Sequence, residues 1–181
     1  MATNLTPDST ENKLILLFVL DKMEIPLTEN SIIDICTSTN SWLKYMDCKD
    51  ALWQLIDVNF IYKTLDCEGE NRYNITMSGR ACLSHFAVQI RAHLREEITK
   101  FANENRMKFK RAQEYISKYA KNTDGTHTVT LKIIDPLESQ NLFEIKMKMS
   151  SRKQAIVASN KWKDKAPQIY EMLYDMLGES E

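Results

Sequence analysis

The side chains of this sequence that are the best candidates to bind a nucleic acid lie on one predicted helix, just before it, and on the hairpin that follows it. The helix covers residues 48–59, CKDALWQLIDVN, and its polar and aromatic residues lie opposite an apolar stripe. Lysine and glutamine can hydrogen-bond to base edges or phosphates, whereas aspartate repels the phosphate backbone. The candidate DNA-binding surface has eight members: Lys44, Tyr45, Lys49, Asp50, Trp53, Gln54, Lys63 and Arg72.

Each of these side chains also has an ordinary structural interpretation. Trp53 could wedge against DNA or a partner, but we expect it to pack under the hairpin or against the preceding loop, because tryptophan is usually buried. Arg72 could contact phosphate or form a salt bridge with Asp66 or Glu70. The helix lysines could bind phosphate or be solvated surface. Together with Glu68, these carboxylates make the hairpin tip acidic, which opposes its insertion beside phosphate.

No other set of side chains predicts catalysis or a metal site. The sequence contains no GxSxG, P-loop or GxGxxG motif, and its three histidines form no HExxH pattern. Its four cysteines include no CxxC pair, so they resemble neither a zinc site nor a dense disulfide framework. They are Cys36, Cys48, Cys67 and Cys82. We therefore expect a protein that is not an enzyme, has no cofactor and keeps its thiols reduced.

The apolar runs of the sequence are too short to cross a membrane. The longest, residues 14–20, has seven residues, whereas a bilayer requires ~20. This run has no basic segment before it and no small-residue cleavage site after it, so the sequence does not predict secretion. We expect a cytoplasmic protein without a membrane partner.

Charge is unevenly distributed, although the net charge of the 181 residues is only −1. Residues 1–80 carry 12 acidic and 7 basic side chains, a net charge of −5, and residues 81–121 carry 4 and 9, a net charge of +5. Residues 122–181 carry 9 and 8, a net charge of −1. Any basic surface should therefore centre on the middle of the chain.

Three helices are predicted to position the candidate DNA-binding surface. The first covers residues 12–23, is apolar almost all round, and follows Asp8, which is a suitable cap together with Glu11. Thr28 can cap a short second helix, and Asp47 can cap the third. The predicted inward face of the third helix consists of Cys48, Leu52, Leu55 and Ile56.

A hairpin and a fourth helix are predicted to follow. Residues 60–66 and 72–76 are strand-like, and the turn CEGEN separates them. Tyr73 and Ile75 alternate with polar residues, which indicates a sheet with one buried face. Thr76 can cap the next helix, whose apolar stripe continues to residue 101 as one long helix or as two that meet near Arg91.

From about Lys108 onwards the apolar period changes from helical to alternating. Three strands, with the turns NTDG and DPLESQ between them, predict an antiparallel meander with one apolar face. Ser150 or Ser151 can cap a helix that covers this face, and Pro167 should restart or kink it. The predicted inward stripe of the last helix consists of Ile169, Tyr170, Leu173, Tyr174 and Leu177.

These elements predict an α+β protein in two parts. Residues 1–90 have the helix, helix, helix, hairpin, helix layout of a winged helix-turn-helix domain, in which the third helix can lie in a major groove. Residues 91–181 form an α+β domain: a helix, a three-stranded antiparallel meander and C-terminal helices that cover it. An aromatic group in this part could line a small-ligand pocket or, as we expect, form an ordinary core. Its members are Tyr115, Tyr119, Phe143 and Trp162.

Four segments carry a resemblance to a known family. NKLILLFVLDKMEIPLTENSIIDI, ALWQLIDVNFIY, RYNITMSGR and SSRKQAIVASNKWKDKAPQIYEML resemble a bacterial family catalogued as a domain of unknown function, number 4364. The resemblance implies a winged-helix transcriptional regulator with a C-terminal α+β domain. ITMSG resembles the segment that closes the wing in bacterial winged-helix regulators, where the threonine caps the next helix and the glycine lets that helix pass close to the wing.

The sequence therefore favours a non-catalytic DNA-binding transcriptional regulator. The alternative is a winged-helix module that binds a protein, which the acidic hairpin tip permits, or that senses a small-molecule effector through the second domain. Because winged-helix regulators usually dimerise, we expect a homodimer by analogy of fold.

Overall fold

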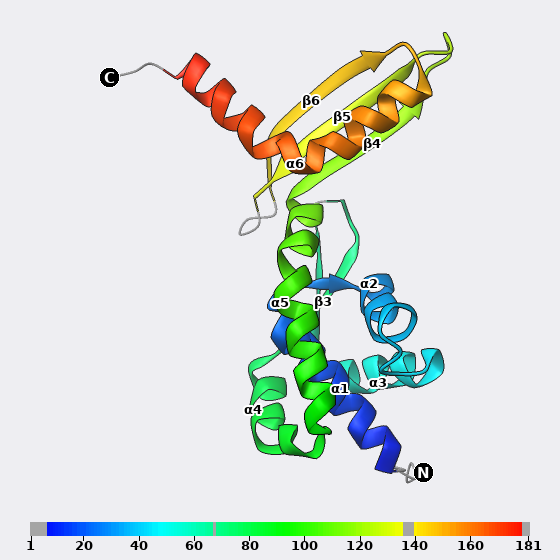
Figure 1. The fold of residues 1–181 in the computed structure, drawn as a ribbon, viewed down its shortest axis with the longest axis vertical. Coiled ribbons are helices and arrows are strands. Elements are labelled where there is room, and N and C mark those ends of the chain that lie inside the picture. The colour runs from blue at the N-terminus through cyan, green and yellow to red at the C-terminus, as the bar shows by residue number, and fades with distance from the viewer. Residues whose placement is uncertain (1–6, 67, 136–139, 179–181) are drawn as a thin grey trace. The chain divides into compact units, whose positions relative to one another are not determined.

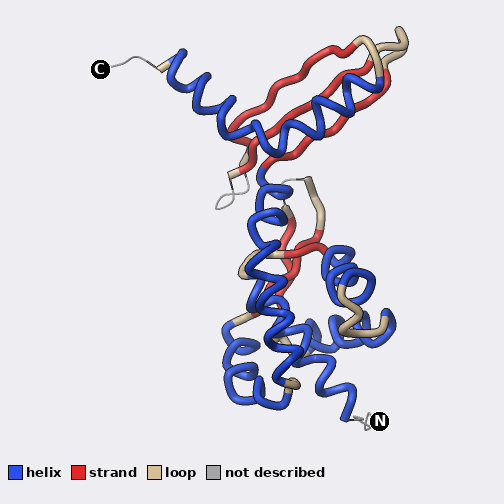
Figure 2. Tube along the Cα trace, viewed as in Figure 1, coloured by secondary structure: helices blue, strands red, loops and turns tan. Residues whose placement is uncertain are grey.

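The computed structural model describes residues 7–66, 68–135 and 140–178 (Figure 1). Within these residues the protein is a mixed α+β structure with six α-helices and two three-stranded antiparallel sheets. The chain divides into two compact units, residues 1–107 and residues 108–181, and each unit contains one of the sheets (Figure 2). Cys67 and most of the DPLESQ turn lie outside the described residues.

Helix α1 (Pro7–Met23) is the centre of the first unit. Every residue from Leu14 to Leu20 is buried, as expected for a helix that is apolar almost all round. The chain is already helical at Pro7, so Asp8 lies inside the helix and the predicted cap is wrong. Proline suits the first turn of a helix, because the backbone N–H that it lacks has no partner there.

Strand β1 (Leu27–Thr28) leads into helix α2 (Glu29–Asp34). The predicted Thr28 cap is confirmed, because its Oγ1 accepts a hydrogen bond from the Ser31 N–H at 3.2 Å. A π-helical turn, Ile35–Thr39, continues α2 and ends at Asn40.

Helix α3 (Tyr45–Asp57) begins three residues before its predicted start. Its N-cap is Lys44, which makes no side-chain cap bond, so the predicted Asp47 cap is wrong. Asp47 lies in the first turn instead, where a carboxylate complements the helix dipole. Cys48, Leu52 and Leu55 are buried as predicted, together with Ala51.

The predicted hairpin is confirmed as strands β2 (Ile61–Leu65) and β3 (Asn71–Ile75). The short strand β1 pairs with the other edge of β3, so the sheet order is β1-β3-β2. Tyr73 and Ile75 are buried, as their alternation predicted. Because β1 precedes α2, its pairing ties the hairpin to the helical part of the unit.

Helix α4 (Met77–Phe86) is capped by Thr76, as predicted. Thr76 Oγ1 accepts a hydrogen bond from the Gly79 N–H at 3.0 Å and donates to the Asn59 carbonyl oxygen at 2.9 Å. A Cβ atom on Gly79 would lie 2.4 Å from the Phe60 carbonyl oxygen. The close approach that the resemblance implied for this glycine is therefore present.

A 3-10 turn, Ala87–Gln89, separates α4 from helix α5 (Ala92–Glu114). The long apolar stripe thus belongs to two helices that meet near Arg91, which was one of the two predicted arrangements. Helix α5 continues to Glu114, beyond the predicted change of period near Lys108.

The second unit contains the predicted meander. Strands β4 (Tyr115–Lys121), β5 (His127–Ile134) and β6 (Asn141–Met149) form a sheet in the order β4-β5-β6. Helix α6 (Arg152–Leu177) lies across this sheet (Figure 1), and Ser151 caps it by accepting from the Gln154 N–H at 3.3 Å. A single helix therefore covers the sheet where several were predicted. Pro167 lies inside it, so the helix does not restart there, and Figure 1 shows that α6 bends along its length.

The core of the second unit is built around Trp162. Its ring is buried and stacks on Phe143, with 6.2 Å between ring centroids, and its Nε1–H donates to the Lys132 carbonyl oxygen at 3.1 Å. Tyr115 packs against the same cluster, whereas Tyr119 is exposed. Three of the four aromatic residues thus belong to an ordinary sheet-on-helix core.

The predicted inward stripe of the last helix is confirmed only in part, at Ile169 and at the half-buried Leu173. Tyr170, Tyr174 and Leu177 are exposed, whereas Ile169 packs against the core cluster. The buried residues of α6 are Ala155, Trp162 and Ala166, all before the proline. The reason is the extent of the sheet: the end of α6, red in Figure 1, continues past the strands.

Candidate nucleic-acid interface

Six of the eight members of the candidate DNA-binding surface lie on or directly before helix α3. Tyr45, Asp50 and Gln54 are exposed on this helix, and Lys44 is exposed at its N-cap. The opposite side of α3 carries the buried Cys48, Ala51, Leu52 and Leu55. One side of α3 thus anchors the helix, and the other side is open to a partner.

The expected burial of Trp53 is wrong, because 58% of the residue is exposed. Successive residues of a helix point about 100° apart, so the residue after Leu52 turns away from the buried stripe. Met46, seven residues earlier, is also exposed and lies on the same side of the helix. The sequence could have predicted that Met46 and Trp53 are exposed, since both residues lie outside the apolar stripe.

Three members of the surface line a polar hollow. Lys44, Asp50 and Gln54, with Asp47, Ser9 and Asn12, surround a volume of about 360 Å³ between the start of α1 and α3. One lysine and two aspartates face this space. The hollow therefore offers donors and acceptors for hydrogen bonds but no excess of positive charge.

Lys49 has an acidic partner on helix α2. Its Nζ lies 3.3 Å from Glu29 Oε1 and 5.8 Å from the centre of the Tyr45 ring. The hydrogen bond to Glu29, followed by the charge interaction with Tyr45, raises the pKa of Lys49. Lys49 is therefore a cation held in place between an acidic and an aromatic side chain.

Arg72 forms the predicted alternative salt bridge. Its Nε and Nη2 lie 2.9 and 2.8 Å from Asp66 Oδ2, and its side chain is mostly buried. Asp66 Oδ1 also accepts hydrogen bonds from the backbone N–H groups of Glu68 and Glu70. This carboxylate organises the hairpin turn and neutralises Arg72. Lys63 is exposed on β2 and, within the described residues, belongs to no ion pair.

Apolar side chains of the hairpin add to the exposed surface of the first unit. Tyr62 and Leu65 on β2 are exposed, and so is Val58 directly after α3. None of these three residues was predicted to belong to a binding surface. Strand alternation could have indicated Tyr62, which points away from the buried Ile61, but it places Leu65 on the same face as Ile61 and gives no sign of its exposure.

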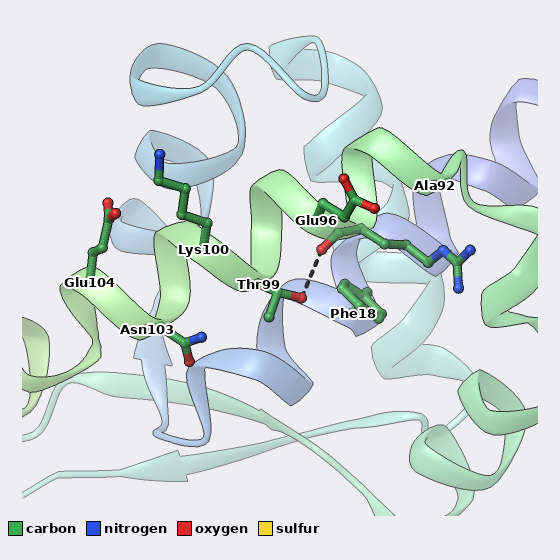
Figure 3. Close-up of a pocket in the computed structure, with 8 residues that line it drawn as sticks. Phe18, Ala92, Glu96, Thr99, Lys100, Asn103 and Glu104 are labelled. Atoms are coloured by element: carbon green, nitrogen blue, oxygen red, sulfur yellow. Dashed lines mark hydrogen bonds between the residues drawn. The ribbon is translucent and has the colours of Figure 1, made fainter.

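A second hollow lies along α5 and contains no member of the candidate DNA-binding surface (Figure 3). It has a volume of about 650 Å³, and Phe18 of α1 lies beneath the helix there. Arg95 and Lys100 line it together with Glu96 and Glu104, so its charges are mixed. Thr99 Oγ1 donates to the Arg95 carbonyl oxygen at 2.7 Å. The alternating charges do not favour a polyanion here.

Two kinds of feature are absent from the described residues. Nowhere in them do three or more His, Cys, Asp or Glu side chains gather in a way that could hold a metal ion. None of their helices combines the length and apolar character that crossing a bilayer requires.

The chain was also compared with known proteins. Residues 12–177 match the model of one family, described as a domain of unknown function (DUF4364). No curated protein and no solved structure matches the chain.

Proposed function

This chain belongs to the DUF4364 family, and from the exposed side of helix α3 we propose that it is a non-catalytic, DNA-binding transcriptional regulator of the winged-helix type. The observation that carries the proposal is that α3 places Lys44 and Gln54 at the solvent, with the half-buried Lys49 beside them, while its other side is anchored in the core. A helix anchored on one side and polar on the other suits a major groove.

The arrangement around α3 supports the same proposal. Helix α2 and its π-helical turn precede α3, and the hairpin β2-β3 follows it. The pairing of β1 with β3 holds that hairpin beside the helices. In a winged helix the second helix braces the reading helix and the hairpin contacts a neighbouring part of the duplex. Residues 1–90 would form this DNA-binding domain.

The proposed roles of the surface residues follow from their environments. Lys44 and Lys63 are exposed cations for phosphate, whereas Lys49 and Gln54 can donate to base edges. Asp50 can accept a hydrogen bond from a cytosine amino group. Tyr45 and Trp53 would supply apolar contacts to the groove.

The hairpin would contribute less than in a basic wing. Arg72 already holds Asp66, and Glu68 and Glu70 are exposed at the same turn. A tip of this charge stays away from phosphate. We therefore propose that α3 enters the groove while only Lys63 on β2 approaches the backbone.

Exposed apolar residues favour a second candidate, a protein partner for the same surface. Met46 and Trp53 on α3, with Tyr62 and Leu65 on β2, would suit the aromatic and methionine-rich centre of a protein interface. In this version the acidic hairpin tip would face a basic partner.

The remaining alternative, a small-molecule effector, was predicted to act through the second domain, whereas the hollow that would suit it lies in the first unit. Leu14, Leu55 and Phe86 are among the residues that line an apolar hollow of about 690 Å³ between α1, the end of α3 and α4. This volume lies within the range of ligand pockets. Metabolites that bind there should raise the melting temperature by mass action.

The proposal is tested by fluorescence anisotropy with the upstream DNA of the gene itself and a scrambled duplex, at low and at moderate salt. We expect preferential binding to the upstream DNA, weakened by salt. Lys44→Ala should lower the slope of log affinity against log salt by about one, as loss of one phosphate contact requires. Lys100→Ala, an exposed lysine on α5 outside the surface, is the matched control. Equal binding to both duplexes, or no binding at either salt, would reject the DNA hypothesis and leave the protein partner.

The second part of the chain, residues 91–181, is proposed to serve dimerisation or sensing in a cytoplasmic homodimer.

A further inference from the structure

The last part of helix α6 exposes a dense group of apolar side chains. Beyond Pro167, Tyr174 is 69% exposed, Met176 73% and Leu177 81%, and Tyr170 and Met172 are also exposed. Within the described residues of the second unit, the strands leave these five side chains open to solvent except where Tyr170 contacts Phe143 of β6. Contiguous exposed apolar groups of this size mark an interaction surface.

The sequence of this segment is apolar around most of the helix. Only Glu171 and Asp175 are charged between Pro167 and Leu177, and their spacing of four residues puts them on one narrow side. A helix that is apolar over most of its circumference is normally buried. The acidic side would stay in water when the rest of the segment is covered.

A shallow groove lies on the same surface as the projecting side chains. Phe143 of β6 and the end of α6 enclose a volume of about 340 Å³, lined by Tyr170, Leu173, Tyr174 and Leu177. The Tyr170 ring meets the Phe143 ring edge to face, with 6.2 Å between centroids. The surface therefore presents both a groove and projecting side chains, as a two-fold symmetric contact requires.

We propose that the end of α6 is the interface of a homodimer, in which the exposed apolar side chains of each copy fill the groove of the other. This inference does not rest on DNA binding. We define the α6 interface as Phe143 with the exposed and groove-lining residues of the segment, namely Tyr170, Met172, Leu173, Tyr174, Met176 and Leu177.

The available area is close to what a stable dimer requires. Taking about 200 Å² for a fully exposed side chain of this size, the five exposed side chains offer on the order of 600 Å² per copy. Stable interfaces bury ~800 Å² per partner. Covering the groove-lining residues adds to this area, so a second copy can supply the missing contacts.

Other occupants fit this surface less well. A small molecule in the groove would leave Met172 and Met176 uncovered, because neither lines it. An anionic membrane or a nucleic acid would meet Glu171 and Asp175 beside the apolar residues, and like charges repel. A second copy has neither disadvantage.

The test is the oligomeric state of the full chain, measured by analytical ultracentrifugation over a dilution series. We expect a dimer for the natural protein and a dissociation constant at least about 100-fold higher for the double variant Tyr174→Glu and Leu177→Glu, because the dimer would then bury unpaired charge. Val88→Glu places the same charge on a side chain of the first unit that is 77% exposed, and it should leave the dimer intact.

Leu177→Ser adds no charge and is expected to weaken the dimer about tenfold. It replaces the charged double variant in the test if that variant does not fold. Circular dichroism should show unchanged helix content in all variants. A natural protein that is monomeric at every concentration, or a double variant that remains dimeric, would overturn the proposal. Flotation of the monomeric protein with phosphatidylserine vesicles would also overturn it and assign the surface to a membrane.

Discussion

Helices α3 and α6 both expose aromatic and aliphatic side chains, but the polar residues beside them differ. Trp53 on α3 lies among Lys49, Asp50 and Gln54, so a partner there must satisfy hydrogen bonds as well as cover an aromatic ring. At the end of α6, the charged residues near Tyr174 are both acidic, Glu171 and Asp175. The two surfaces expose similar apolar side chains but suit different partners, because the polar residues beside them differ.

The two surfaces also differ in how the protein anchors them. The buried residues of α3 lie along most of its length, from Cys48 to Leu55, opposite its exposed side. Those of α6 end at Ala166, so the exposed segment continues beyond its anchor. We expect α3 to hold its geometry without a partner and the end of α6 to gain stability from one.

The largest expected effect comes from removing the anchor of α6. Trp162→Ala should lower the free energy of unfolding of the second unit by about 4 kcal/mol, through the cavity left against Phe143 and the lost bond to Lys132. Urea denaturation followed by circular dichroism measures this change. Val157→Ala, on an exposed part of the same helix, should change it by less than about 0.5 kcal/mol.

A smaller loss is expected when the hairpin is separated from the helices in the first unit. Gly79→Ala should cost about 2 to 3 kcal/mol, because the new Cβ would lie 2.4 Å from the Phe60 carbonyl oxygen and 2.9 Å from Ile75 Cγ1. Chemical denaturation would detect it, with the adjacent exposed Ser78→Ala as control. If both variants were equally stable, the close contact between α4 and the hairpin would not matter for the fold.

An exchange of variants sharpens the comparison between the two surfaces. Trp53→Ala should weaken DNA binding by about 1 kcal/mol, typical for loss of an aromatic contact, and leave the dimer unchanged. Tyr174→Ala should weaken the dimer and leave the intrinsic affinity of each α3 for DNA unchanged. Anisotropy and ultracentrifugation on both variants measure the two effects. If Trp53→Ala weakened the dimer instead, α3 rather than α6 would form the contact between copies.

The smallest effect concerns acid. Lys148, whose Nζ lies 2.6 Å from Asp124 Oδ2, and then Thr126 lower the pKa of Asp124 from its ordinary value of 3.8. Because the folded-state pKa is the lower one, the stabilisation is fully present above pH ~4 and is lost as the pH falls towards the folded value.

Both partners are exposed, so the contribution is small. Asp124→Asn should slightly reduce the acid sensitivity of the second unit, measured by thermal unfolding between pH 5 and pH 2, roughly the range in which a lowered carboxyl pKa acts. Glu171→Gln, on the end of α6, is the matched control. A larger acid sensitivity in the Asp124→Asn variant would contradict the sign of the pKa shift.

Local signals in the sequence predicted the elements whose causes are local. Thr28, Thr76 and Ser151 cap helices because a side-chain oxygen one residue before a helix reaches a free N–H whatever the tertiary context. Alternation of apolar residues likewise predicted the buried side of β3, with Tyr73 and Ile75.

The same local signal failed at Asp8 and Asp47, which lie inside their helices, and the other errors arose where distant elements decide. Glu29 holds Lys49 because α2 packs beside α3, and no spacing along the chain shows this pair. The burial of Trp53 was expected because tryptophan is buried on average, but its position around the helix, away from the buried stripe, leaves it exposed. Periodicity predicted an apolar side for the end of α6 but did not show where the sheet beneath it ends.

Pro167 marks a position in α6 after which the rest of the helix could be replaced by protein engineering. Because proline removes the N–H that would bond four residues back, the helix after it depends least on the turns before it. The segment from Pro167 to Leu177 could be replaced by a short coiled-coil or a polar helix while Trp162 keeps the core closed. The assembly state of this protein would then become a property that can be chosen by changing one end of one helix.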